Sequence, residues 1–328
     1  MQSVPQRVLI AGFGSIGRRH FDLVRARLPE AAITILRRPG SIGEVSGATV
    51  VENLESAIAT NPDFAILSGP APFRLPLASR LAEAGVPLLL EKPLSSSYED
   101  VEEFAALASS KGVLVQVGYC LRFEPSLAAL KSALDEGLIG RLLMVSAEVG
   151  QYLPDWRPGA DYRQSVSAQK RLGGGVLLEL SHEIDYLLWL FGPIANLSAR
   201  TYQISDLELD VEDFAQLDLA FENGVVGSAR LDMVQRAKTR GCKIIGDAGS
   251  LVWDGIGKTT TLFKGDDEVG VVVHQSQSNT MYESQLDHFL SCLESGSPPL
   301  VGIDDGAKVL RVVDAARRAN ASGKRVVP

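Results

Sequence analysis

The chain has 328 residues, of which 45 % are hydrophobic and 22 % charged, a composition typical of a globular protein with material for two domains. The formal net charge of −8 argues against a nucleic-acid partner, because proteins of that kind usually carry a basic patch. The three cysteines form no CxxC pair, and no apolar run is long enough to span a bilayer. Since no signal-peptide pattern opens the sequence, we expect a cytoplasmic protein without a membrane partner.

The first stretch with a clear pattern is RVLIAGFGSIGRRHFDLVRARL, residues 7–28. Its GxGxxG glycines stand between a predicted strand at 8–11 and a helix that starts near residue 15. In this setting the helix N-terminus is typical of a dinucleotide site, where backbone N–H groups bind the pyrophosphate. A glycine-rich turn without a ligand is the alternative. The predicted cofactor contacts are Gly12, Gly14, Ser15, Ile16 and Gly17.

The second predicted strand, residues 32–36, indicates which dinucleotide binds. NAD-binding folds usually place an acid about 20 residues past the glycines. Here Arg37 and Arg38 follow the strand instead. Because arginines suit a 2′-phosphate, we predict NADP as the cofactor and NAD as the alternative. Two solvated surface arginines would fit the same sequence.

Further strands at 64–69, 86–93 and 113–119 alternate with helices at 73–85 and 97–112, which predicts a parallel sheet. Ligands of such sheets bind beyond the carboxyl ends of the strands. The residues expected at those ends are Ser68, Pro70, Glu91, Lys92 and Tyr119.

The second half of the chain has a different pattern. A helix over 125–137 precedes extended stretches at 141–153, 195–204, 213–234 and 243–255, several of which alternate apolar and polar residues. Asn223-Gly224 predicts a hairpin, and two amphipathic helices follow at 281–296 and 306–323. We therefore predict an α/β Rossmann domain over 1–121, followed by an α+β domain over 122–328 with an open, mainly antiparallel sheet.

Three motifs, GFGSIG (12–17), EKP (91–93) and GGGVLLELSHEID (173–185), stand in an order that resembles the Gfo/Idh/MocA family of glucose-fructose oxidoreductase-like and inositol dehydrogenase-like enzymes. The resemblance covers essentially the whole chain. It implies a nicotinamide cofactor, a sugar or cyclitol substrate, a sheet domain often used for oligomerisation, and catalytic roles for Lys92 and His182. Asp185 matches the family's H-x-x-D acid. Most members have an Asp four residues before the His, where this chain has Leu178, and the neighbouring Glu179 is the candidate replacement.

The run over 177–191 predicts one helix with Glu179, His182, Tyr186 and Trp189 on a shared polar face. A core histidine satisfied by Glu179 or Asp185 is the alternative to a catalytic His182. We expect no metal, because HEIDY lacks the second histidine of HExxH. The loop over 151–165 is a candidate substrate lid, or else a surface loop. The candidate substrate contacts are Lys92, Tyr119, Arg122, Tyr152, Trp156, Arg157, Arg163 and His182.

These features favour an NAD(P)-dependent oxidoreductase that transfers a hydride to or from a secondary alcohol of a sugar, sugar derivative or cyclitol. His182 is the expected base and Lys92 the stabiliser of negative charge on oxygen, although the two roles could be exchanged. An NAD-retaining glycosidase and a non-catalytic nucleotide-sensing regulator are the alternatives. We also expect a homodimer or homotetramer formed through the outer face of the second sheet, with Val225 and Met233 pointing outward.

Overall fold

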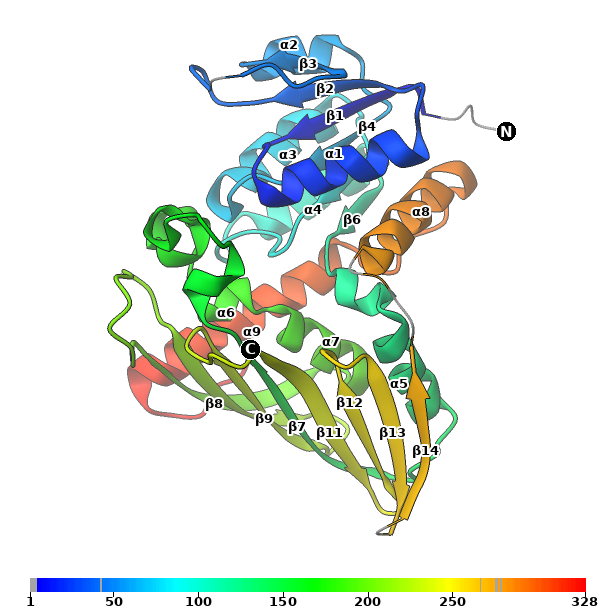
Figure 1. Cartoon of the computed structure of the whole chain (residues 1–328), viewed down its shortest axis with the longest axis vertical. Helices are drawn as coiled ribbons and strands as arrows, with labels where there is room; N and C mark the ends of the chain where they lie inside the picture. The colour runs from blue at the N-terminus through cyan, green and yellow to red at the C-terminus, as the bar shows by residue number, and fades with distance from the viewer. Residues whose placement is uncertain (1–4, 42, 266, 275–276, 278) are drawn as a thin grey trace. The chain divides into compact units, whose positions relative to one another are not determined.

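The computed structural model describes residues 5–41, 43–265, 267–274, 277 and 279–328. The chain divides into two compact units. One comprises Met1–Tyr119 and Tyr282–Ala307, and the other comprises Cys120–Met281 and Lys308–Pro328. The first contains a parallel sheet with helices and the second an open, mainly antiparallel sheet, so the predicted fold class is confirmed (Figure 1).

In the first unit the described residues form a six-stranded parallel sheet in the order β3-β2-β1-β4-β5-β6. Its central strands are short apolar runs that are fully buried, as expected where helices cover both faces. The strands are β1 (Arg7–Ala11), β2 (Ala32–Leu36), β3 (Ala48–Val51), β4 (Phe64–Leu67), β5 (Leu88–Leu90) and β6 (Val115–Val117). The helices are α1 (Ser15–Arg27), α2 (Leu54–Ala59), α3 (Arg74–Glu83), α4 (Val101–Ser110) and α8 (Thr280–Ser295).

Helix α8 completes the core of this unit, although the sequence interpretation groups it with the second half of the chain. Leu286 and Phe289 are buried among β-strand residues of the first sheet. The Phe289 ring lies edge-to-face on Phe64, with 5.4 Å between centroids. The amphipathic pattern of α8 predicts a buried face but does not identify which sheet buries it.

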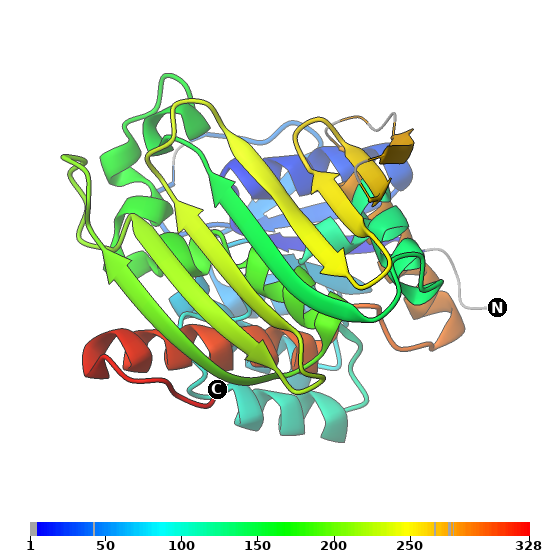
Figure 2. The ribbon, with the colours of Figure 1, turned by 90° about the horizontal axis from the view of Figure 1, so that it is seen from below.

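In the second unit the described strands form an eight-stranded sheet in the order β14-β13-β12-β11-β7-β10-β9-β8 (Figure 2). Among its described pairs, only β7 with β10 is parallel. The predicted Asn-Gly hairpin is confirmed between β9 and β10. The strands are β7 (Leu142–Gly150), β8 (Ile194–Tyr202), β9 (Phe214–Phe221), β10 (Val226–Asp232), β11 (Thr239–Gly246), β12 (Ser250–Asp254), β13 (Thr259–Lys264) and β14 (Asp267–Val273). The helices are α5 (Pro125–Asp135), α6 (Val176–Glu179), α7 (His182–Phe191) and α9 (Ile303–Ser322), the last of which begins in the first unit.

The prediction of one helix over 177–191 is wrong. Helix α6 ends at Glu179 and α7 begins at His182, because the backbone of Leu180, with φ −102° and ψ +26°, departs from the helical conformation. The shared polar face is also wrong, since Tyr186 is fully buried and its ring packs edge-on against Trp253 at 5.5 Å.

The outward placement of Val225 and Met233 is wrong as well. Their exposed fractions are 2 % and 0 %, because both side chains belong to the core of the second unit. The apolar side chains that do face outward nearby are Met144 at 43 % and Val226 at 55 %, which are register partners on β7 and β10. No described helix is long and apolar enough to cross a bilayer.

Candidate active site

The glycine turn between β1 and α1 is shaped by close backbone packing. Gly12 has a φ of +93°, a conformation that L side chains rarely adopt, and a Cβ there would lie 2.9 Å from the Gly69 nitrogen. A Cβ on Gly17 would lie 2.3 Å from the Gly12 oxygen. Both positions therefore require glycine so that β1, β4 and α1 can meet.

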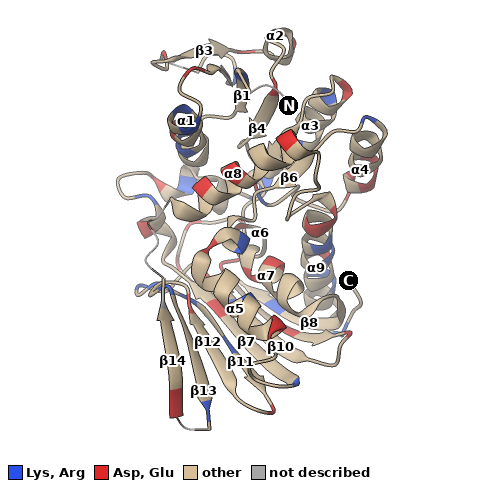
Figure 3. Ribbon diagram, turned by 90° about the vertical axis from the view of Figure 1, so that its right-hand side faces the viewer, with Lys and Arg blue, Asp and Glu red and all other residues tan. Residues whose placement is uncertain are grey.

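The remaining glycine leaves room for a ligand. A Cβ on Gly14 would meet nothing within 4 Å, and no side chain of the described residues caps the N-terminus of α1. Backbone N–H groups at such a helix start bind anions readily. Figure 3 also shows basic residues gathered on α1. These features fit the pyrophosphate of a dinucleotide.

Ser68 and Pro70 follow β4 beside this turn. The Ser68 hydroxyl donates to the carbonyl oxygens of Ala11 and Gly12, at 3.1 and 2.9 Å. Ser68 therefore braces the glycine turn from the neighbouring strand, and Pro70 begins a short 3-10 turn, Ala71–Phe73.

The EKP motif follows β5, and its acid, Glu91, is bound by a residue of the same unit. Glu91 is buried at 6 % exposure, and its Oε1 lies 2.7 Å from Nε2 of His20 on α1. Burial raises the pKa of Glu91, but the hydrogen bond from His20 and the positive charges of His20, Arg74 and Lys92 outweigh it and lower the pKa. Lys92 itself is partly exposed.

Two residues that the sequence analysis did not select, His20 and Arg74, support this motif. The Arg74 guanidinium donates to the carbonyl oxygen of Pro93 and, at 2.7 Å, to that of Gly69. A signal existed for His20, since a histidine three residues after the last glycine falls on the buried face of α1 with Leu23 and Val24. No local pattern indicates its partner.

Of the two arginines after β2, Arg37 is partly exposed and Arg38 is exposed. Arg37 donates to the Gly43 carbonyl oxygen at 3.0 Å, and its guanidinium lies 6.0 Å from the centre of the Phe13 ring. Arg18 lies on the same ring at 4.7 Å. Phe13 of the glycine turn is thus flanked by positive charge.

In the second unit, two carboxylates of α7 bind arginines outside that helix. Arg122 binds Asp185 with two hydrogen bonds of 3.1 and 2.7 Å, and both side chains are buried. Glu183, which is fully buried, pairs with Arg240 of β11 at 2.9 Å. His182 is the first residue of α7 and is 8 % exposed. The charges in this apolar run are therefore largely paired within the unit.

The glycine run before α6 has a packing role. A Cβ on Gly175 would lie 2.6 Å from a carboxylate oxygen of Glu212, and Gly175 has a φ of +101°. Burial raises the pKa of Glu212 despite hydrogen bonds and nearby positive charges that lower it. Glu179 accepts a 2.7 Å hydrogen bond from the Ser167 hydroxyl.

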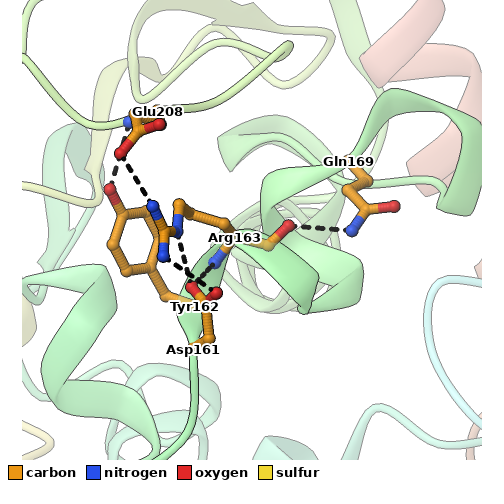
Figure 4. Close-up of polar contacts among 5 residues, drawn as sticks. All are labelled: Asp161, Tyr162, Arg163, Gln169 and Glu208. Atoms are coloured by element: carbon orange, nitrogen blue, oxygen red, sulfur yellow. Dashed lines mark hydrogen bonds and ion pairs between the residues drawn. The ribbon is translucent and has the colours of Figure 1, made fainter.

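The candidate lid is held by an exposed ionic cluster (Figure 4). Arg163 donates to Asp161 at 2.8 Å and to Glu208 at 3.2 Å, and Glu208 donates its backbone N–H to the Tyr162 hydroxyl. Arg163 therefore fixes this loop to the segment around Glu208.

The other candidate substrate residues differ in exposure. Arg157 is exposed, whereas Tyr119 is fully buried. The Tyr152 ring lies 3.5 Å from the Arg236 guanidinium, and the Trp156 indole donates to the Gln151 carbonyl oxygen.

Comparison with known proteins agrees with this fold. The profile of an oxidoreductase family with an NAD-binding Rossmann fold matches residues 6–119, and that of the Gfo/Idh/MocA C-terminal domain matches residues 127–252. An uncharacterised oxidoreductase of Synechocystis sp. is 30 % identical over 214 residues, which cover 61 % of this chain and 57 % of the relative. Myo-inositol dehydrogenase Hyg17 of Streptomyces leeuwenhoekii is 27 % identical over 340 residues, covering 96 % of this chain and 98 % of the relative.

Among solved structures, the WlbA dehydrogenase from Bordetella pertussis in complex with NADH and UDP-GlcNAcA has a TM-score of 0.83 at 22 % identity, and 98 % of each chain is covered. That likeness shows a shared fold. The fold and both profile matches define an oxidoreductase with an NAD-binding Rossmann domain. The chain belongs to the Gfo/Idh/MocA family.

Proposed function

We propose that this protein is an NAD(P)-dependent dehydrogenase acting on a secondary alcohol of a sugar, sugar derivative or cyclitol. The observation that carries the proposal is the order of strands in the first sheet. The glycine turn follows β1, Ser68 follows β4 and Lys92 follows β5, and these strands are parallel neighbours. A cofactor on the glycine turn would lie along the sheet edge that presents Lys92.

The cofactor would be held by the glycine turn and the adjoining strand ends, and when bound it supplies the hydride chemistry. The proposed contacts are Gly12, Gly14, Ser15, Ile16, Gly17, Arg37, Arg38, Ser68, Pro70, Glu91 and Lys92. Lys92 would hydrogen-bond the reacting oxygen and stabilise its negative charge. His182 would accept the hydroxyl proton, with the Glu179 or Asp185 carboxylate orienting the imidazole.

The substrate class is supported by the similar proteins. One full-length relative is a myo-inositol dehydrogenase, and one protein of the same fold is in complex with a nucleotide sugar acid. Myo-inositol and UDP-GlcNAcA, the molecules in these names, both carry several ring hydroxyls. Arg157, an exposed arginine on the 151–165 loop, suits a substrate with an acidic group.

The test is turnover measured by nicotinamide absorbance, with NAD⁺ or NADP⁺ and a panel of cyclitols, free sugars, sugar acids and nucleotide sugars. We expect net reduction of the cofactor with at least one polyol. Glycoside cleavage without net cofactor turnover would favour the NAD-retaining glycosidase. Cofactor binding without conversion of any panel member would contradict the dehydrogenase and favour a regulator.

We also propose that the protein is a homodimer or homotetramer formed through the outer face of the second sheet. Met144 and Val226 support this proposal, because two large apolar side chains side by side on an exposed sheet face favour a protein interface.

A further inference from the structure

In the first unit, a series of hydrogen bonds connects α1, the helix that begins at the glycine turn, with the EKP turn that contains Lys92. His20 is fully buried on α1, and its Nε2 lies 2.7 Å from Glu91 Oε1. The second oxygen of the same carboxylate accepts the backbone N–H of Lys92 at 3.2 Å. One carboxylate therefore binds both the helix that begins at the glycine turn and the backbone of Lys92.

The direction of the first hydrogen bond follows from the charge on Glu91. Because the pKa of this carboxyl is lowered, Glu91 is ionised near neutral pH and accepts a hydrogen bond from Nε2–H of His20. Nδ1 of His20 is buried without a hydrogen-bond partner among the described residues, so Glu91 is the hydrogen-bond partner that the structure gives this imidazole.

The turn is also held from its other side. Arg74, which is 5 % exposed, donates to the carbonyl oxygens of Pro93 and Gly69. Gly69 lies between Ser68 and Pro70, so this bond ties the EKP turn to the strand end that braces the glycines. The backbone around Lys92 is thus fixed by one contact from α1 and one from α3.

We propose that His20 is a positioning residue for Lys92. It acts through Glu91, which holds the EKP turn in a fixed position relative to α1. A buried ionic pair is seldom the most stabilising way to fill a core, because well-packed apolar residues serve as well or better. The His20–Glu91 pair also binds the backbone N–H of Lys92, so we infer that its role is to orient Lys92. This inference rests on the proposed role of Lys92 in catalysis.

The test compares two substitutions at one site. In His20→Gln the amide nitrogen takes the place of Nε2 and still donates to Glu91, whereas His20→Leu removes the donor. We expect His20→Leu to lower kcat by about tenfold to 10²-fold, since small displacements of a catalytic group cost rates of that order. The kcat of His20→Gln should stay within about threefold of wild type. Both variants should bind NAD(P)H with an affinity within about threefold of wild type, because Ser68 and the glycine packing hold the N-terminus of α1 separately. Loss of cofactor affinity equal to the loss of kcat in His20→Leu would overturn the proposal.

Leu23→Ala is the matched control, because Leu23 is buried on the same helix and lies outside this chain of hydrogen bonds. It should lower Tm while leaving kcat near wild type. An equal fall in kcat for Leu23→Ala would mean that any damage to α1 slows the enzyme, and would overturn the proposal. If His20→Leu does not fold, His20→Met, which also lacks a hydrogen-bond donor, replaces it with the same expected loss of kcat.

A double mutant separates this inference from the proposed function. In a Lys92→Ala background, His20→Leu should lower the residual kcat by less than about twofold, because the residue it positions is gone. An undiminished effect there would overturn the positioning role. If Lys92→Ala alone kept wild-type kcat, the proposed role of Lys92 would fail first, whatever His20→Leu did.

Discussion

The Asp185 carboxylate receives two hydrogen bonds from the Arg122 guanidinium, one at 3.1 Å and one at 2.7 Å, with neither side chain more than 5 % exposed. This pair joins the 3-10 turn Cys120–Phe123 to the first turn of α7. It therefore fixes the end of α7 that presents His182.

Asp185→Asn should destabilise the protein by about 3–5 kcal/mol, because the substitution leaves a buried guanidinium opposite a neutral amide. Urea unfolding monitored by circular dichroism measures the change. Glu148→Gln is the control, since the Glu148–Arg230 pair is about half exposed and should contribute at most about 1 kcal/mol. Equal effects of the two substitutions would contradict the structural importance of the buried pair.

Lys92→Ala and His182→Ala should each lower kcat by about 10²–10⁴, the usual contribution of a positioned acid–base group. The double mutant should lose much less than the product of the single losses, since groups that act on one oxygen are not additive. Steady-state kinetics with the true substrate, beside NADPH titrations, give the measurement. A folded His182→Ala protein with near-wild-type kcat would make His182 a core histidine.

Glu179→Gln distinguishes two roles for that acid. If Glu179 orients His182, the substitution should lower kcat by an amount between wild type and His182→Ala. If its role is limited to the Ser167 hydroxyl, then Ser167→Ala and Glu179→Gln should both lower Tm and leave kcat unchanged. A fall in kcat for Ser167→Ala as large as that for Glu179→Gln would point to a shared structural cause.

NADPH should bind at least about tenfold more tightly than NADH, because a charge-assisted pair with a 2′-phosphate is worth roughly 1.5–3 kcal/mol. Arg37→Asp should reverse the preference. Arg27→Asp makes the same charge change at the far end of α1, where Arg27 pairs with Asp287, and should leave the preference intact. Fluorescence titration of both cofactors decides the question, and equal affinities in wild type would make Arg37 and Arg38 ordinary surface charges.

Glu212 should make stability depend on pH in a defined direction. Its raised pKa means that the folded state favours the protonated carboxyl. That stability is present below the unfolded value of about 4.3 and is lost as the pH rises through the folded value. Glu212→Gln should therefore gain Tm relative to wild type as the pH rises from about 4 toward neutrality. Thermal melts of both proteins across this range provide the test, and a constant difference would contradict it.

Light scattering at micromolar concentration should give the mass of a dimer or tetramer. Val226→Glu should shift the mass toward the monomer, because it places a charge on the exposed apolar pair. Ile256→Glu, in the turn between β12 and β13, is a control of similar exposure and should leave the mass unchanged. A monomeric wild type would remove the proposed interface.

Local patterns predicted most of the fold. The strand read from AITIL coincides with β2, and the Asn-Gly hairpin lies where its turn chemistry placed it. Three strands and one helix, namely β3, β13, β14 and α2, were not predicted from the sequence. β3, β13 and α2 are short and partly exposed, and residues 267–272 of β14 are exposed, so none has a clear hydrophobic periodicity. The break between α6 and α7 lies at Leu180, and no local pattern in the sequence predicts it.

In the candidate site, too, local motifs could be predicted from the sequence and long-range contacts could not. The glycine turn and Lys92 are local motifs, so their residues could be named from the sequence. His20 and Glu91 are 71 positions apart, and Arg122 and Asp185 are 63 positions apart, so their pairing depends on topology. The polar face predicted from Glu179, His182, Tyr186 and Trp189 assumed one continuous helix, whereas the structure has two. Glu183 and Asp185 are buried, and each binds an arginine.

The placement of α8 has a consequence for biosynthesis. Leu286 and Phe289 belong to the same core as the first two strands, yet the ribosome adds them only after strands β7 to β14 of the second unit. The nascent nucleotide-binding unit therefore stays incomplete, with the surface around Phe64 uncovered, while most of the second unit is being made. Domains generally fold during synthesis with the N-terminal one first. In this chain the N-terminal unit is instead the one that must wait for a late helix.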